Sequence, residues 1–293
     1  MSGTRDILRR IKAVKNTGKI TKAMQLVAAS KMQRAQNTAR KGRAYSLMLA
    51  EILESLITNA DSIEHPLLNK RTVKNRGILV VSTDKGLCGS LNANLFRMII
   101  EQVKDSASYV TVGRKAKLFI SRTKRDLLAD FPVSDHVEFA EIRAAVEFML
   151  KAYLEGKIDT IEVIFPRFIN TLIQTPTIEK LVPLTDLHEE VAALRKRFGE
   201  ETIKPTQPDS GAMIFEPNAD AMLQLLPDMF LKQEIYQMVL EAKASEHSAR
   251  MVAMKSATDN AKNLVDDLSL QYNKARQAAI TQEILEIAAA SAA

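Results

Sequence analysis

The stretch VVSTDKGLCGSLN, residues 80–92, contains the residue types best suited to chemistry. An apolar run ends in a Ser-Thr-Asp triplet, a glycine turn holds the chain's only cysteine, Cys88, and a helix is expected from about Asn92. A strand, a glycine turn and a helix in this order can build a phosphate-binding loop or expose a nucleophile. Cys88 would then be a thiol activated at a helix N-terminus.

Each chemical interpretation lacks a required feature. The spacing of a P-loop is absent, and Gly86 and Gly89 do not form a dinucleotide fingerprint. A thiol nucleophile needs a base, and none of the four histidines lies in an obvious motif: His65, His136, His188 and His247. We therefore expect a tight strand-to-helix turn in which glycines take positive φ. A thiol- or nucleotide-dependent enzyme is the alternative.

Metal-ligand patterns are also missing from the sequence. The adjacent pairs Asp266-Asp267 and Glu189-Glu190 fall in probable helices, where neighbouring side chains point apart. We predict no catalytic residue, no cofactor and no metal ligand.

Composition and charge bound the class of protein. The chain has 293 residues, 46% of them hydrophobic, so it can form one or two domains. One cysteine excludes an internal disulfide framework, and no uninterrupted apolar run is long enough to span a membrane. Residues 1–43 hold twelve Lys or Arg and one Asp, a net charge of +11. The whole chain carries +6, so the remainder carries −5 and the basicity belongs to one element.

This basic segment has a coiled-coil spacing. Uncharged residues recur at alternating intervals of three and four: Thr4, Ile7, Ile11, Val14, Gly18, Thr21, Gln25, Ala28, Met32, Ala35, Ala39 and Gly42. Because this pattern continues for some 40 residues, we favour a structural helix over a transit peptide. The small seam residues predict a partner helix that approaches closely. The basic surface predicts an acidic protein partner more readily than nucleic acid, because no aromatic residue precedes Tyr45.

A second uncharged seam lies near the other end of the chain. Its members are Ala244, His247, Met251, Met254, Thr258, Ala261, Val265, Leu268, Tyr272, Ala275 and Ala279. We predict helices over about 3–58 and 218–287, wrapped around each other in an antiparallel coiled coil. Ordinary amphipathic helices in a bundle are the alternative, but globular helices are usually much shorter.

The middle of the chain predicts a small α/β layer. Runs rich in β-branched residues at 77–82, 109–113 and 160–166 alternate with helical stretches near 92–104, 114–126 and 139–155, which favours a mainly parallel sheet. The segment 172–184 predicts a further strand pair or an edge strand, because Pro176 fits only an edge or a bulge.

The expected fold is therefore mixed: a long antiparallel two-helix coiled coil from the N- and C-termini, with a small central α/β (Rossmann-like) domain. We expect an N-terminal coiled-coil helix over 1–60, an α/β domain over 77–184, a polar connector over 185–211 and a C-terminal coiled-coil helix over 212–293.

Three long motifs resemble a known family. They are RIKAVKNTGKITKAMQLVAASKMQRAQ at 10–36, VVSTDKGLCGSLN at 80–92, and ASEHSARMVAMKSATDNAKNL at 244–264, continued by YNKARQAAITQEILEI at 272–287. In this order they are similar to gamma subunits of F-type ATP synthases. The resemblance covers nearly the whole chain, closely at both ends and loosely in the middle.

The resemblance implies a non-catalytic rotor. Its terminal coiled coil would turn inside a hexamer of alpha and beta subunits, and its foot would rest with the epsilon subunit on the membrane c-ring. Positions that match family contacts to the beta subunit are Met24, Arg276, Gln277 and Thr281. Phe215 and Glu216 match the region near the c-ring. The tip, ILEIAAASAA, resembles the part that sits in an apolar sleeve.

Some residues depart from the family pattern. Ser90 replaces a common glycine, Ala290-Ser291 replaces a usual Gly-Ala pair, and 185–211 does not match well, which leaves the ring and epsilon contacts less defined than the shaft. No inserted cysteine pair of the chloroplast type is present. No cleavable leader is evident, so we expect a peripheral protein on the cytoplasmic side of a bacterial inner membrane.

Overall fold

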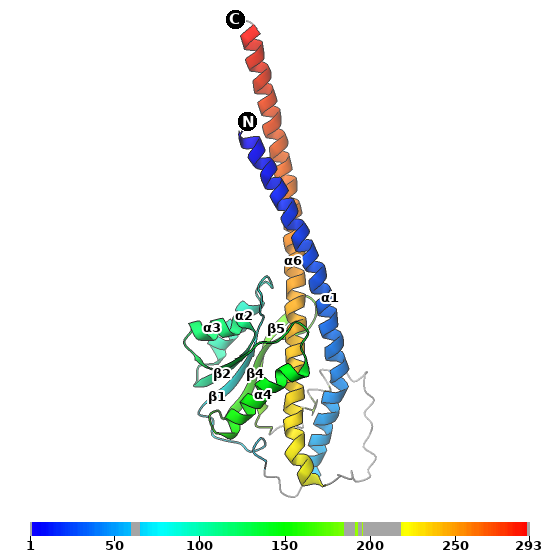
Figure 1. The fold of residues 1–293 in the computed structure, drawn as a ribbon, viewed down its shortest axis with the longest axis vertical. Coiled ribbons are helices and arrows are strands. Elements are labelled where there is room, and N and C mark those ends of the chain that lie inside the picture. Colours follow the sequence, from blue (N-terminus) through cyan, green and yellow to red (C-terminus); the bar gives the residue numbers. More distant parts are fainter. Residues whose placement is uncertain (1, 60–64, 185–190, 193–194, 196–217, 292–293) are drawn as a thin grey trace. The chain divides into compact units, whose positions relative to one another are not determined.

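The fold is described from a computed structural model, which covers residues 2–59, 65–184, 191–192, 195 and 218–291 (Figure 1). The chain divides into two compact units. Unit 1 combines Met1–Ser30 with Arg250–Ala293, and unit 2 is Lys31–Ala249. Phe215, Glu216 and all of the expected connector except residues 191, 192 and 195 lie outside the described residues.

Two long helices contribute to both units. Helix α1 spans Ser2–Asn59 and helix α6 spans Ala219–Ser291, close to the predicted bounds of about 3–58 and 218–287. Pro227 lies inside α6 near its beginning, and the helix continues through it. The remaining residues of α6 include neither Gly nor Pro, so nothing in the sequence ends the helix early.

The two helices pair antiparallel in unit 1, as predicted. The Thr21 and Thr258 hydroxyls are hydrogen-bonded at 2.7 Å. One turn earlier on α1, a Cβ at Gly18 would stand 3.4 Å from the Ala261 Cβ. Small residues therefore let the two backbones approach closely, which larger side chains at these positions would prevent.

Burial follows both predicted seams. In unit 1 every described seam side chain is buried or half-buried, whereas Lys and Arg residues of α1 between them are exposed. The same register holds within unit 2, where the Gln233 side chain donates to the Ser46 hydroxyl at 3.3 Å and a Cβ at Gly42 would overlap Gln237.

Unit 2 contains a five-stranded sheet in the order β3-β2-β1-β4-β5. The first four strands are parallel, and β5 runs antiparallel to β4 at the edge. The strands are β1 (Arg76–Val81), β2 (Ala107–Val112), β3 (Asp126–Phe131), β4 (Thr160–Phe168) and β5 (Gln174–Val182). The three predicted β-branched strands are confirmed, and 172–184 supplies a single edge strand that includes Pro176.

Two layers of helix cover the sheet, because alternate side chains of each strand point to opposite faces. Ile78 and Val80 of β1 pack with α2 (Leu91–Gln102) and α3 (Arg114–Arg122). Leu79 and Val81 belong to the larger core, which α4 (Phe139–Leu154) shares with parts of α1 and α6 (Figure 1).

Strand β3 is the main correction to the predicted elements. The helix expected over 114–126 ends at Arg122, and a left-handed turn at Lys124, with φ of 53°, leads into β3. The sequence of β3, DLLADF, contains no β-branched residue and two aspartates. It forms a strand because it pairs with β2 at the sheet edge, a tertiary effect that strand propensity does not report.

Candidate functional site

The turn at residues 80–92 anchors the N-terminus of α3. The first backbone N–H groups of a helix have no partner within the helix. Here those of Arg114, Lys115 and Ala116 are accepted by the three residues that follow β1. The acceptors are Asp84 Oδ1 at 3.0 Å, the Thr83 carbonyl at 3.0 Å and Ser82 Oγ at 2.7 Å. The polar triplet that could have bound a phosphate is therefore hydrogen-bonded to the first N–H groups of α3 instead.

Cys88 is part of the same internal network. Its side chain is 3% exposed, and the Asn92 amide donates to Cys88 Sγ at 3.4 Å and to Thr83 Oγ1 at 2.8 Å. Buried thiols of this kind are usually structural rather than reactive. Gly89 takes positive φ as predicted, but Gly86 does not, and Leu87 occupies the left-handed region with φ of 63°.

A metal centre and a membrane-spanning helix are both missing from the described part of the chain. Within those ranges, no group of three or more His, Cys, Asp or Glu side chains could hold a metal ion. The helices described there include none that is both long and apolar enough to cross a membrane. We take the outer face of the helix pair in unit 1 as the candidate functional surface, because it carries the basic side chains of α1.

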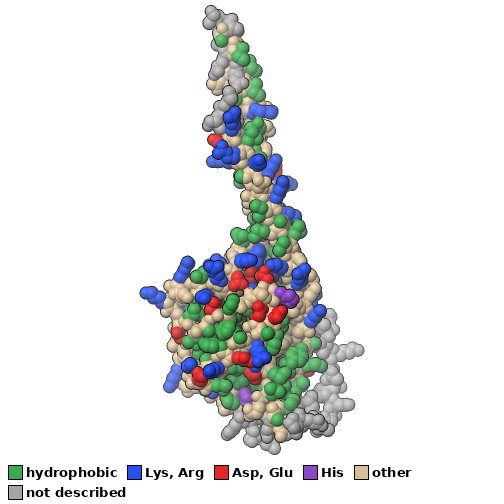
Figure 2. Space-filling view, in the orientation of Figure 1, with side chains coloured by type: hydrophobic (Ala, Val, Ile, Leu, Met, Phe, Trp, Pro, Cys, Tyr) green, Lys and Arg blue, Asp and Glu red, His purple; other side chains and the backbone are tan. Residues whose placement is uncertain are grey.

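A hollow of about 500 Å³ lies on this helix pair. Its apolar and small lining residues come from both seams: Val14, Gly18, Thr258, Ala261 and Val265. Four exposed lysines also line it: Lys15, Lys19, Lys22 and Lys262. Ammonium groups around an apolar floor suit a partner that combines acidic and apolar side chains. Figure 2 shows Lys and Arg side chains spaced along these helices, with few acidic ones among them.

Apolar side chains lie beside the lysines on α1. Ile20 and Val27 are 60% and 56% exposed, and Met24, half-buried, lies between them at helical spacing on the same face. Of the three, only Met24 was predicted, from the family resemblance. Ile20 and Val27 are apolar but lie outside the seam positions. An apolar residue outside the seam is the sequence feature that could have marked them as surface contacts.

Arg276, Gln277 and Thr281 are all exposed on α6. Gln277 and Thr281 are one turn apart, and the Thr281 hydroxyl donates to the Gln277 carbonyl at 2.9 Å. The Arg276 guanidinium forms no ion pair with a described residue, so its donors are available to a partner. In the observed register the beginning of α1 lies opposite Arg276 and Gln277. The structure thus brings these three residues together and keeps Met24 several turns away on the other helix.

The last turns of α6 extend beyond the beginning of α1. Ile284, Leu285 and Ile287 are 60%, 63% and 70% exposed. Several exposed apolar side chains on one helix make this end a candidate interaction surface.

Comparison with known proteins gives a consistent result. A protein-family model described as ATP synthase matches residues 3–293. The ATP synthase gamma chain of Opitutus terrae is 54% identical over 291 residues, covering 99% of this chain and 98% of the relative. That of Methylacidiphilum infernorum is 45% identical, with 99% and 98% covered.

Solved structures share the fold. A chain of the Euglena gracilis mitochondrial ATP synthase, solved by cryo-EM with F1 and the c-ring, superposes with a TM-score of 0.66 at 17% identity, covering 98% of this chain and 92% of that one. A chain from the central stalk and c-ring structure of the Tetrahymena thermophila enzyme gives 0.58 at 21% identity, with 81% and 99% covered.

Proposed function

Because this chain belongs to the ATP synthase gamma chain family, we propose that it is the central rotor shaft of an F-type ATP synthase. In this role it couples ion-driven rotation of the membrane c-ring to the conformational cycle of the beta subunits. ATP is made or hydrolysed in the beta subunits, and this chain forms no bond itself. It binds no cofactor or metal.

The antiparallel pairing of the terminal helices in unit 1 carries this proposal. Gly18 against Ala261, and Thr21 against Thr258, hold two helices at close range, so each supports the other against bending. A two-helix rod also has different side chains on each side. Three beta subunits around it would therefore meet different surfaces, and rotation would favour a different conformation in each.

The lysine-lined hollow and the apolar residues beside it fit a lever of the beta subunit. The family resemblance implies that this lever is acidic, and carboxylates are attracted to Lys15, Lys19 and Lys22. Met24 would give the same lever an apolar contact. Because Lys side chains are flexible, such a contact can form and break as the shaft turns.

Arg276, Gln277 and Thr281 would contact a loop of one beta subunit. A planar guanidinium can bind a carboxylate through two parallel hydrogen bonds, which makes this contact directional. The exposed apolar tip beyond Thr281 would lie in an apolar sleeve of the hexamer. Small side chains near its end would limit interlocking and allow rotation.

The contacts with the c-ring and the epsilon subunit are proposed from the family resemblance. Phe215 and Glu216 would contact the c-ring, and the epsilon subunit would bind near the α/β domain. Together they would place the chain at the cytoplasmic face of a bacterial inner membrane, as a peripheral protein. Relatives of the same fold come from structures that include the c-ring.

Co-purification with the catalytic subunits tests the function. Alpha and beta subunits would be expressed with a tagged form of this chain, and the complex weighed by native mass spectrometry. We expect one copy for every three alpha–beta pairs. If the chain elutes alone, or in variable ratio, the rotor proposal is wrong.

Two further outcomes would point to the alternative functions. A Cys88→Ser substitution should leave the activity of the assembled complex unchanged, whereas a thiol enzyme would lose its activity. Binding of DNA by the chain alone, with steep salt dependence, would instead indicate a nucleic-acid-binding protein.

A further inference from the structure

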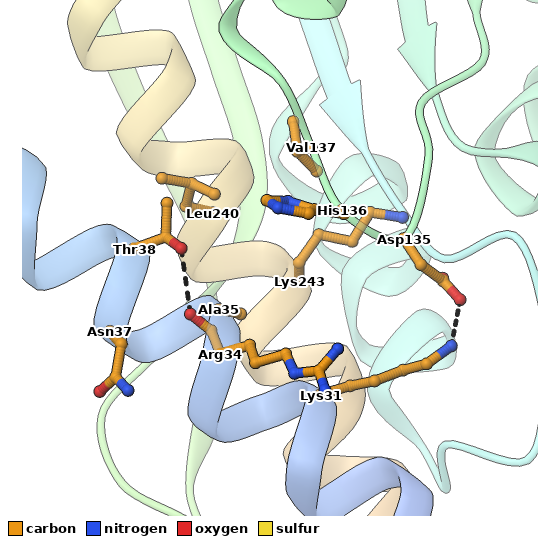
Figure 3. A pocket seen from close by; sticks show the side chains of 10 residues that line it. All are labelled: Lys31, Arg34, Ala35, Asn37, Thr38, Asp135, His136, Val137, Leu240 and Lys243. Carbon is orange, nitrogen blue, oxygen red and sulfur yellow. Dashed lines mark hydrogen bonds and ion pairs between the residues drawn. The ribbon is translucent and has the colours of Figure 1, made fainter.

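Two loops at the carboxyl ends of the parallel strands reach the two long helices within unit 2. Asp84 follows β1, and Asp135 lies in the loop between β3 and α4. Because β1 and β3 run in the same direction, both loops leave the sheet at the carboxyl ends of its parallel strands. Asp135 pairs with Lys31 of α1, and Asp84 pairs with Lys243 of α6. Figure 3 shows Lys31 reaching Asp135 and Lys243 extending from α6 toward the same loop.

Lys243 is the most enclosed of these charges. Its side chain is only 3% exposed, and its ammonium lies 3.5 Å from Asp84 Oδ2 and 3.7 Å from Glu246 Oε2. A buried ammonium is costly unless acids compensate it. Asp84 is itself fixed to the α/β layer, because its other oxygen accepts the Arg114 N–H at 3.0 Å. Asp84 therefore joins the N-terminus of α3 to the middle of α6.

A third polar contact lies one turn further along α6. The Ser248 hydroxyl donates to the Thr171 carbonyl, in the connection between β4 and β5, at 2.7 Å. Three loops of the α/β layer thus hold the helix pair by directional contacts. These contacts end at the limit of unit 2, since residues from Arg250 onward belong to unit 1.

We propose that Asp84–Lys243 and Lys31–Asp135 form a torsional clamp that transmits torque between the α/β domain and the two long helices. This inference rests on the proposed rotor function. Apolar packing is non-directional, so it resists separation of two surfaces better than sliding between them. Ion pairs and hydrogen bonds depend on position and angle, and they would resist the sliding that torque imposes.

Coupled and uncoupled activity of the assembled complex test the clamp. Asp84→Asn keeps an oxygen for the Arg114 N–H but removes the charge, and Lys243→Met keeps the apolar stem. ATP hydrolysis by the catalytic subunits with this chain should stay within about twofold of the parent, because no load acts on the shaft. Ion-driven ATP synthesis in vesicles should fall by about threefold or more in both variants.

Matched controls remove exposed charges elsewhere on the α/β domain. Asp105→Asn and Lys151→Met should change neither activity, since Asp105 is exposed and the Lys151 side chain is 76% exposed. Lys243→Arg keeps the charge and should retain most of the synthesis rate. Equal subunit content in all complexes separates a loss of torque from a loss of assembly.

The torsional stiffness of the shaft separates the clamp from a general loss of stability. A variant that only lowers the folding stability of the chain should leave this stiffness unchanged once the complex is fully assembled. A bead attached to the α/β domain through Lys104→Cys, with the hexamer fixed, should show a softer shaft in Asp84→Asn and Lys243→Met. If stiffness and synthesis both equal the parent values, the clamp is wrong and the rotor stands. If the parent complex itself shows no torque, the proposed rotor function is wrong, and the clamp proposal that rests on it is wrong as well.

Discussion

Arg276 and Gln277 are exposed on α6, and Arg276 has no ion-pair partner among the described residues. Their role in the fold is therefore small, and the proposed contact with a beta subunit rests on the family resemblance. The same reasoning applies to Thr281, whose hydroxyl is bonded only within its own helix in the described structure.

Removing these side chains should weaken coupling without unfolding the chain. We expect Arg276→Ala and Gln277→Ala to lower both ATP synthesis and hydrolysis of the assembled complex, by about tenfold for Arg276 if it is a central contact. Lys274→Ala, an exposed neighbour on the same helix, is the control. Unchanged synthesis and hydrolysis in both variants would show that the contact is misplaced.

Asp135 gives a prediction about pH. Its hydrogen bond to the Lys31 ammonium holds the pKa of the Asp135 carboxyl below its usual value. A lowered pKa in the folded state stabilises the fold above the unfolded pKa of about 4, and this stabilisation is lost as pH falls through the folded value.

Asp135→Asn should therefore lower the free energy of unfolding by at most about 1 kcal/mol near pH 7, because both partners are partly exposed. The difference from the parent should be constant above about pH 5 and should shrink as pH falls further, through the lowered pKa of Asp135. Urea titration of the full chain, followed by circular dichroism, measures it, with Asp105→Asn as control. If the difference in the free energy of unfolding did not change at acidic pH, the contact between Asp135 and Lys31 would not stabilise the fold as an ion pair.

At the scale of the elements, the close approach of α1 and α6 depends on Gly18. An alanine Cβ there would reach ordinary contact with Ala261 and would improve helix propensity by up to about 1 kcal/mol. Gly18→Ala should therefore be neutral or mildly stabilising. Gly18→Leu should lower stability by about 2 kcal/mol, because the helices must separate. Thermal unfolding followed by circular dichroism distinguishes the two, and an equal effect of both would contradict close seam packing.

The corner between β2 and α3, which passes the end of β1, depends on Gly113. Its φ is 99°, and a Cβ there would overlap the backbone of Ser82. Gly113→Ala should cost about 3 kcal/mol or more. Gly156 is a matched control, since its φ is 72° and no atom lies near its Cβ position.

Gly156→Ala should cost only about 1 kcal/mol. Urea unfolding of the full chain measures both variants. Equal costs would mean that the contact with Ser82 contributes nothing beyond the strain of positive φ.

The sequence predicts the long helices well because their seams repeat over many turns. Thr21 is buried and its charged neighbours Lys19 and Lys22 are exposed, as the spacing requires. Strand β3 was missed because DLLADF becomes a strand only by pairing with β2. Left-handed Leu87 was missed for a similar reason: a bulky residue rarely takes positive φ unless its surroundings impose it.

The candidate site is less predictable than the fold. Periodicity identifies which residues face the partner helix, but an exposed residue on a helix looks the same whether or not a subunit covers it. Met24, Arg276 and Gln277 were therefore named through family resemblance. The clamp could not be predicted, because Lys243 and Asp84 are 159 residues apart and only the tertiary fold brings them together.

At the scale of the whole molecule, charge is divided unevenly along the chain. Residues 1–43 carry +11, whereas the rest of the chain carries −5. A basic helix pair with a lysine-lined hollow fits acidic neighbours around it. Within unit 2, the α/β layer shares its larger core with other parts of α1 and α6.

Rotation of this chain within its complex tests the central claim most directly. The alpha–beta hexamer would be fixed to a surface, and a bead attached to the α/β domain would be followed after ATP is added. We predict stepwise rotation in one direction, with three main pauses per turn, one for each beta subunit. An active complex in which the bead only fluctuates about one angle would contradict the account.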